Sequence, residues 1–174
     1  VKVPLDSVNS LSATFGADYY TSASTDNINN NVSSASSKDV RAYGSIAYQR
    51  KNLKEGSTWG ARAGFSIEYD YSSIQGGLSY SKEFNEGNSE FSLSAQAFID
   101  KWSLIYPSEL RGEVSLSQSD RQSYNLQMGF AQVINKRLQM HLSVDAIYMK
   151  GLLSTPFHRV YFADQLSPDI ERLP

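Results

Sequence analysis

The segment TWGARAGFSIEYD, residues 58–70, decides the fold of this chain, because its side chains change character at every step. One parity is apolar and holds Trp59, Ala61, Ala63, Phe65, Ile67 and Tyr69. The other parity is mainly polar and holds Gly60, Arg62, Gly64, Ser66, Glu68 and Asp70. A period of two is typical of a β-strand with two different faces, whereas in a helix these apolar positions would spread around the whole cylinder. The segment is therefore predicted to be a strand.

The same alternation recurs along most of the chain. It is clear in residues 10–20, 73–84, 89–100, 123–133 and 138–148, and weaker in residues 40–49. Residues 1–5 are expected to end another strand, because Pro4 cannot donate to a ladder. The alternations run over about 10 to 13 residues, against roughly 5–6 for an average strand. A tilted strand that crosses a membrane needs about 9–11, so these strands are long enough to span one.

The connections between the predicted strands follow a second pattern. Every second connection is short, namely LDS, RKNLKEGS, NEGN and INKR. The others are long, at residues 22–38, at residues 101–120 and after Gly151, except for a tight turn around Tyr71. Short periplasmic turns at one end and long loops at the other are typical of bacterial outer-membrane barrels. Aromatic residues near the ends of the apolar faces would form the interfacial girdles of such a barrel.

Composition narrows the functional classes. The chain has 174 residues, enough for one domain, and a net charge of −2, so nucleic acid is not an expected partner. It contains no cysteine, which excludes disulfides and thiolate metal sites, and we expect no cofactor. No apolar run approaches the ~18 residues of a transmembrane helix. Transmembrane barrels carry only shorter alternating segments.

Together these features predict an all-β fold: an antiparallel transmembrane β-barrel with at least eight strands, in a single domain over residues 1–174. We expect the barrel to be incomplete at both ends, with at least two further strands beyond Pro174, because bacterial barrels close with an even strand count. The alternative fold is a soluble β-sandwich, which also needs only one apolar face per strand.

Several stretches resemble a family of Gram-negative outer-membrane proteins known only as a domain of unknown function. They are DYYTSASTDNIN, SSASSKDVRA, FSIEYDYSS, AQVINKRLQ, GLLSTPFHRVYF and ERLP, and they span nearly the whole chain. The resemblance implies an outer-membrane barrel considerably longer than this chain. It implies no activity and no catalytic residues.

The candidate functional residues lie at the polar positions of the predicted strands. They place Asp18, Arg41, Arg62, Glu68, Asp70, Gln96, Asp100, Gln127, His141 and Asp145 on the lumen side of the predicted barrel. Such residues could set the charge selectivity of a pore. Alternatively, they form a hydrogen-bonded network that fills the lumen, where buried charges must be paired. The mixed signs favour the network.

Catalytic and metal sites are not expected. Ser143 and Asp145 share the strand face of His141, but side chains at i, i+2 and i+4 of one strand point in parallel and form no relay. The segment STDNINNN, residues 24–31, has the Asp and Asn density of a calcium loop. It lacks the Gly and the terminal Glu of the EF-hand pattern, so an exposed loop rich in Asx turns is predicted instead.

The segment GLLSTPFHRVYF, residues 151–162, breaks the alternation. It is predicted to lie at the extracellular mouth, and its candidate residues are Gly151, Pro156, Phe157, His158, Arg159 and Tyr161. One hypothesis is a plug that folds across the mouth, with Arg159 and His158 anchored on lumen acids such as Asp70 or Asp100. The alternative is that HRVYF begins the descending strand.

These observations predict a non-catalytic integral protein of the bacterial outer membrane. Its partners are outer-membrane lipid and other outer-membrane or periplasmic proteins, to which it would contribute as an accessory or structural subunit. The alternative function is a porin-like or ligand-specific channel for a small solute. Strand number discriminates the two, because it controls whether side chains fill the lumen.

Overall fold

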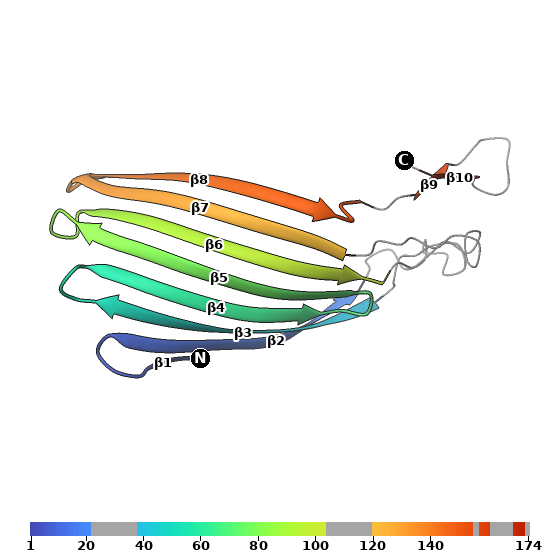
Figure 1. The fold of residues 1–174 in the computed structure, drawn as a ribbon, viewed down its shortest axis with the longest axis horizontal. Helices are drawn as coiled ribbons and strands as arrows, with labels where there is room; N and C mark the ends of the chain where they lie inside the picture. Colours follow the sequence, from blue (N-terminus) through green and yellow to red (C-terminus); the bar gives the residue numbers. More distant parts are fainter. Residues whose placement is uncertain (22–37, 104–119, 155–156, 161–168, 173–174) are drawn as a thin grey trace.

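A computed structural model describes residues 1–21, 38–103, 120–154, 157–160 and 169–172. Eight strands form one antiparallel sheet in chain order (Figure 1). They are β1 (Lys2–Pro4), β2 (Asn9–Thr21), β3 (Lys38–Asn52), β4 (Ser57–Ile67), β5 (Tyr71–Phe84), β6 (Ser89–Trp102), β7 (Asp120–Asn135) and β8 (Leu138–Gly151). The predicted all-β, antiparallel fold with at least eight strands is therefore confirmed. Most of the long strands extend beyond their alternating windows, whereas β4 ends at Ile67, before Tyr69 and Asp70.

The register of the sheet brings all apolar parities to one side. Phe65 of β4 lies opposite Gly44 of β3 and Ile74 of β5, and the same alignment continues through every neighbouring pair. Because side chains alternate along each strand, one face of the whole sheet is apolar and the other is mainly polar. We call them the apolar face and the polar face.

No described residue packs against the apolar face as a second layer. None of the hydrophobic side chains in the described part of the chain is buried. Phe15 is 72% exposed, and Ile74 and Leu78 are each 68% exposed. A β-sandwich would bury this face against a second sheet about 10 Å away. The described residues form no such second layer over the apolar face.

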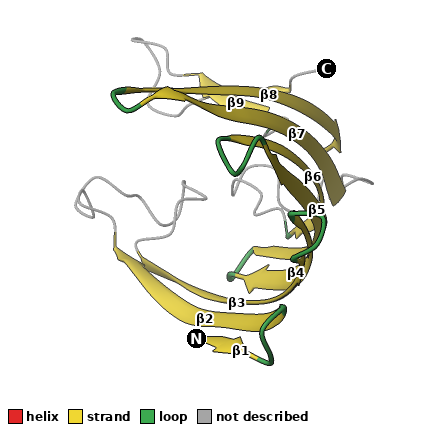
Figure 2. Cartoon of the chain, turned by 90° about the vertical axis from the view of Figure 1, so that its left-hand side faces the viewer, coloured by secondary structure: helices red, strands yellow, loops and turns green. Residues whose placement is uncertain are grey.

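The sheet curves but does not close (Figure 2). β1 pairs only with β2, and β8 pairs only with β7, so both outer strands are free edges among the described residues. The sequence predicted part of a larger barrel, and the described residues form an open sheet that is not closed into a barrel. Physically, the twist and coil of eight strands bend the sheet, while closure also requires the first and last strands to meet.

The two remaining strands lie outside this sheet. β9 (Phe157–Val160) and β10 (Asp169–Arg172) pair with each other, with Arg159 opposite Ile170. The alternative that HRVYF, residues 158–162, begins a strand agrees with β9 for residues 158–160. It is wrong in implying a strand next to β8, because β9 pairs with β10 instead.

The turns sort as the sequence predicted, with two corrections. Short connections at residues 5–8, 53–56, 85–88 and 136–137 lie at one end of the sheet, which we call the turn end (Figure 1). The opposite end, the loop end, contains the tight turn at residues 68–70, so Tyr71 begins β5 rather than lying in the turn. The long connection after β6 is also shorter than expected, because Lys101, Trp102 and Asp120 belong to strands.

Among the described residues there is no helix that is both long and apolar enough to cross a membrane.

Candidate functional site: the polar face

The polar face is the more crowded side of the curved sheet. Ser66 and Ser73 are each only 7% exposed, although the described residues form no second layer over them. Side chains on the inner side of a curve converge and shield one another, whereas those on the outer side spread apart. The difference between these serines and the exposed apolar side chains therefore places the polar face on the concave side, as a lumen wall would be.

A first charged cluster joins β2, β3 and β4 at the loop end. Arg41 lies directly opposite Asp18 of β2. Its Nε donates to Ser66 Oγ at 2.8 Å and lies 3.6 Å from Glu68 Oε1. The Arg41 guanidinium also lies 5.2 Å from the centroid of the Tyr43 ring. Three residues predicted for the lumen network, Asp18, Arg41 and Glu68, are thus brought together across adjacent strands.

A second charged cluster joins β5, β6 and β7 at the same end. Arg121 Nε donates to Asp100 Oδ2 at 2.8 Å, and these residues lie directly opposite each other. The Arg121 guanidinium lies 5.3 Å from the Trp102 ring and 5.9 Å from the Tyr71 ring, so it sits between two aromatic side chains. Asp100 is only 2% exposed. This is the most buried charge on the polar face.

Sequence reasoning found Asp100 and missed its partners. Arg121 and Trp102 fell at the edges of the stretch expected to be a loop, and Tyr71 was expected in a turn. The parity signal was present, because Trp102 continues the polar parity of Gln96 and Asp100, and Arg121 continues that of Gln127. Extending each alternation to its last residue would have found all three.

Arg62 and Gln96 occupy the middle of the polar face. Both lie directly opposite Gly77 of β5, Arg62 from β4 and Gln96 from β6. A side chain at Gly77 would meet Gln96 Cγ at 3.1 Å and Arg62 Cγ at 3.6 Å, so both chains lean over this glycine. A hollow of about 270 Å³ is lined by Arg62, Gln96, Ser79, Ser94 and Gln49 among others.

The structure leaves the other predicted lumen residues separate. His141 and Asp145 lie on the polar face of β8, where every residue is exposed. Neither forms a hydrogen bond or ion pair with another described side chain. Asp70 contributes a backbone contact, because its carbonyl oxygen accepts from the Ser103 amide at 2.7 Å. No group of three or more potential metal ligands occurs in the part of the chain that the structure describes.

The mouth segment is only partly described. Gly151 ends β8 with a φ of 105°, a conformation that favours glycine. Phe157, His158 and Arg159 belong to β9, but only their backbone is described. Pro156, Tyr161 and the segment 24–31 lie outside the described residues. Of the acids proposed as anchors for Arg159, Asp100 is bound by Arg121 instead.

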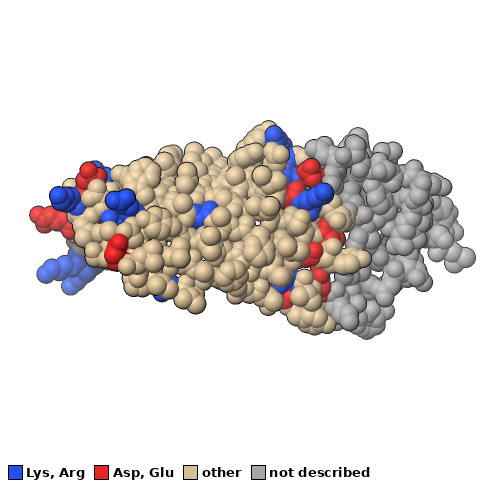
Figure 3. Space-filling model, turned by 60° about the horizontal axis from the view of Figure 1, so that its bottom comes forward, with Lys and Arg blue, Asp and Glu red and all other residues tan. Residues whose placement is uncertain are grey.

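The opposite, apolar face has an uncharged band between two charged margins. Figure 3 shows charged side chains gathered at both ends of the molecule and very few between them. On β3, for example, the outward positions from Val40 to Tyr48 carry no charge, and Arg50 follows them at the turn end. The outward charges of the other strands, Lys82, Lys101, Asp120 and Lys150, also lie near strand ends.

Aromatic side chains mark both margins of this band. Trp59 and Tyr80 pack together near the turn end, with ring centroids 4.5 Å apart. Tyr124 and Tyr148 stack near the loop end at 6.3 Å. Such rings have an apolar body and a polar tip, which suits the boundary between hydrocarbon and water.

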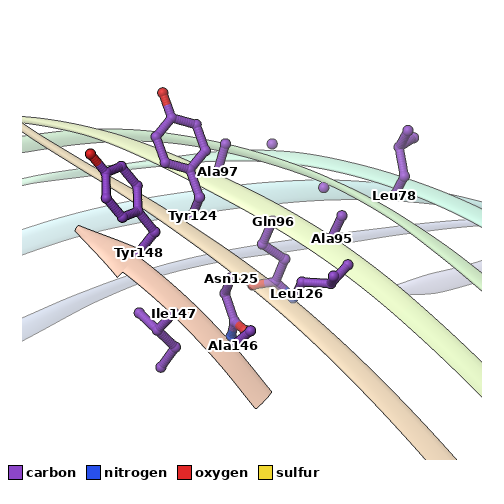
Figure 4. A pocket seen from close by; sticks show the side chains of 12 residues that line it. Leu78, Ala95, Gln96, Ala97, Tyr124, Asn125, Leu126, Ala146, Ile147 and Tyr148 are labelled. Carbon is purple, nitrogen blue, oxygen red and sulfur yellow. The ribbon is translucent and has the colours of Figure 1, made fainter. Parts of the chain in front are cut away.

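Small residues make a shallow depression in the apolar face. It measures about 570 Å³ and is lined by Gly76, Leu78, Ala95, Ala97, Leu126 and Ala146, among others. Figure 4 shows Tyr124 and Tyr148 projecting to one side of the strands, while Asn125 and Ile147 project to the other. Nothing in the described residues covers this depression.

Comparison with known proteins identifies a family. The family described as "Protein of unknown function (DUF3570)" matches residues 7–167. No curated protein and no solved structure matches the chain. The match confirms the resemblance to a family of unknown function, while the outer-membrane location that the resemblance implied stays a prediction.

Proposed function

We propose that this chain, which belongs to the DUF3570 family of unknown function, forms part of the wall of a β-barrel in the bacterial outer membrane. The apolar face contacts lipid, and the polar face lines a lumen. The protein acts without a catalytic step, as a conduit for small hydrophilic solutes.

The observation that carries this proposal is the uncovered apolar face. Its side chains alternate with a hydrated face over strands of 11–16 residues from β2 to β8. Exposing such a face to water would cost about 25 cal/mol for each Å² of apolar surface. Contiguous apolar patches of this kind mark membrane or protein contacts. The uncharged band with aromatic margins favours lipid, because bacterial barrels have this arrangement.

The polar face favours transport over the accessory role. Most positions of its middle rows are small or polar, such as Ser45, Gly77, Ser79, Ser94 and Gln127. Phe98 and Ile147 are bulky exceptions on the same face. The small and polar side chains leave room for water. The large charged clusters lie at the loop end, where they would frame an entrance rather than block the centre.

The test is membrane location together with conductance. Cells expressing the protein are fractionated, the outer membrane is extracted with and without detergent, and the purified protein is inserted into planar bilayers. The proposal expects detergent-dependent extraction and discrete conductance steps. Extraction without detergent would contradict the membrane location. Membrane location without conductance, together with co-purifying proteins, would support the accessory subunit instead.

A further inference from the structure

We infer that Arg62 is the centre of an anion-binding subsite on the polar face, which binds small solutes that carry a phosphate or carboxylate group. This inference names the solute class for the proposed transport function and rests on that function for its biological role. The binding chemistry itself depends only on the arrangement of β4, β5 and β6.

Arg62 differs from the other two arginines that the structure places on the polar face. Arg41 is paired with Glu68, and Arg121 is paired with Asp100. Arg62 lies opposite Ala47 on one side and Gly77 on the other, and it forms no ion pair with any described residue. Its side chain is exposed to the concave side. Among the described residues, no acidic side chain occupies the donors of this guanidinium.

The nearest acidic residues on the polar face of β5 and β6 lie far from Arg62. Asp100 lies four residues beyond Gln96 toward the loop end, and it is already bound by Arg121. Glu83 lies six residues beyond Gly77 toward the turn end. At about 3.3 Å per residue these separations are roughly 13 Å and 20 Å. Both exceed a Debye length of about 8 Å at physiological ionic strength, so these two acids are largely screened from Arg62.

The surroundings of Arg62 supply neutral hydrogen-bonding groups. The hydroxyls of Ser79 and Ser94 and the amide of Gln96 line the same hollow of about 270 Å³. Gly77 contributes to the hollow because it has no side chain, so Arg62 and Gln96 can both lean over it and toward each other. A guanidinium binds an oxyanion through two parallel N–H donors, and serine and glutamine groups can bind the remaining oxygens.

The test is a binding titration with inorganic phosphate and with acetate on the detergent-solubilised protein, by calorimetry. Three variants are compared with the wild type: Arg62→Gln, Arg62→Lys and, as the control, Arg50→Gln. Arg50 lies on the apolar parity at the turn end. Folding of each variant is checked by circular dichroism and heat-modifiable mobility.

We expect Arg62→Gln to weaken phosphate binding by about tenfold to a hundredfold, since charge-assisted hydrogen bonds are lost. Arg62→Lys should retain part of the affinity because it keeps the charge and loses the fork of donors. Arg50→Gln should bind as the wild type does. Unchanged affinity in folded Arg62→Gln, or no phosphate or acetate binding by the wild type, would overturn the inference.

The titration separates this inference from the proposed function. In planar bilayers, a preference for chloride over potassium that falls in Arg62→Gln would support both. Binding without any conductance would keep the anion subsite and overturn transport. Conductance with unchanged selectivity and unchanged phosphate affinity in Arg62→Gln would keep transport and overturn the subsite.

Discussion

Arg121 and Asp100 face each other directly across β7 and β6, with Arg121 Nε donating to Asp100 Oδ2 at 2.8 Å. The carboxylate is 2% exposed and the arginine side chain 23% exposed. The Arg41 and Glu68 pair is built on the same pattern, but these side chains are 40% and 25% exposed and lie 3.6 Å apart. The two pairs therefore allow a test, within one sheet, of how burial changes the contribution of an ion pair to stability.

Removing the arginine of the buried pair should lower the stability of the protein more than removing the arginine of the exposed pair. Arg121→Ala leaves a buried, uncompensated carboxylate, and we expect it to lower the free energy of unfolding by about 3–5 kcal/mol. The matched Arg41→Ala breaks a pair exposed to solvent and should cost at most about 1 kcal/mol. Urea unfolding in lipid vesicles, followed by tryptophan fluorescence, measures both. Equal losses in the two variants would contradict the burial argument.

A glycine on the apolar face is covered by two phenylalanine rings. A side chain at Gly44 would meet Phe15 Cδ1 and Phe65 Cε1, each at 2.8 Å. Gly44→Ala must push the rings apart and should cost about 1–3 kcal/mol. Gly76→Ala is the control on the same face, because its nearest neighbour would be a backbone oxygen at 3.9 Å. We expect Gly76→Ala to be neutral or stabilising by about 0.4–1 kcal/mol, in the same urea measurement.

Substitution by arginine should have different effects on stability at two adjacent residues of β5. Leu78 lies on the apolar face and Ser79 on the polar face. Leu78→Arg places a guanidinium in lipid and should cost about 2–4 kcal/mol. Ser79→Arg stays in water and should leave stability nearly unchanged while altering ion selectivity. Heat-modifiable mobility of outer-membrane extracts reports assembly. Normal assembly of Leu78→Arg would argue against a lipid-facing position.

The turn between β1 and β2 should depend on pH through one carboxylate. Hydrogen bonds from the Asn9 side chain, then from the Val8 and Asn9 amides, hold the pKa of Asp6 below its ordinary value. A lowered folded pKa means that this contribution is present at neutral pH and is lost as the pH falls through the folded pKa. Hydrogen exchange at Val8 and Asn9 should therefore be slow at neutral pH and quicken as the pH falls through the lowered pKa of Asp6.

The control for the turn is Asp6→Ala. This variant removes the acceptor and should show fast exchange at Val8 and Asn9 at every pH, after correction for intrinsic rates. Exchange that is slow in Asp6→Ala, or equally pH-dependent in both proteins, would show that the carboxylate does not hold the turn.

The fold was largely predictable because a period of two is a local signal. In segments such as 58–67, the alternation of apolar and polar residues identifies a strand and the face on which each side chain lies. The strands and their succession along the chain can therefore be predicted without knowledge of distant contacts. Closure could not be predicted in the same way, because it depends on whether β1 meets β8. No pattern within either strand reports that contact.

The site was predictable in part. Polar parity placed Arg41, Glu68, Arg62 and Asp100 on one face. It could not show that Asp100 is paired with Arg121, nor that Arg62 has no acidic partner among the residues the structure describes, because pairing depends on the register between strands. Strand ends were the weakest point, and Trp102 and Arg121 lie there. Polar residues near a strand end resemble loop residues when a sequence is read alone.

The central claim is that the apolar face contacts lipid and the polar face contacts water. The chain has no cysteine, so single cysteines at positions 74–79 of β5 can carry a nitroxide label in lipid vesicles. Electron paramagnetic resonance then compares collisions with oxygen, which concentrates in lipid, and with a water-soluble nickel chelate. The account predicts strict alternation, with positions 74, 76 and 78 favouring oxygen and positions 75, 77 and 79 favouring nickel. Equal access of the nickel chelate to all six positions would contradict it.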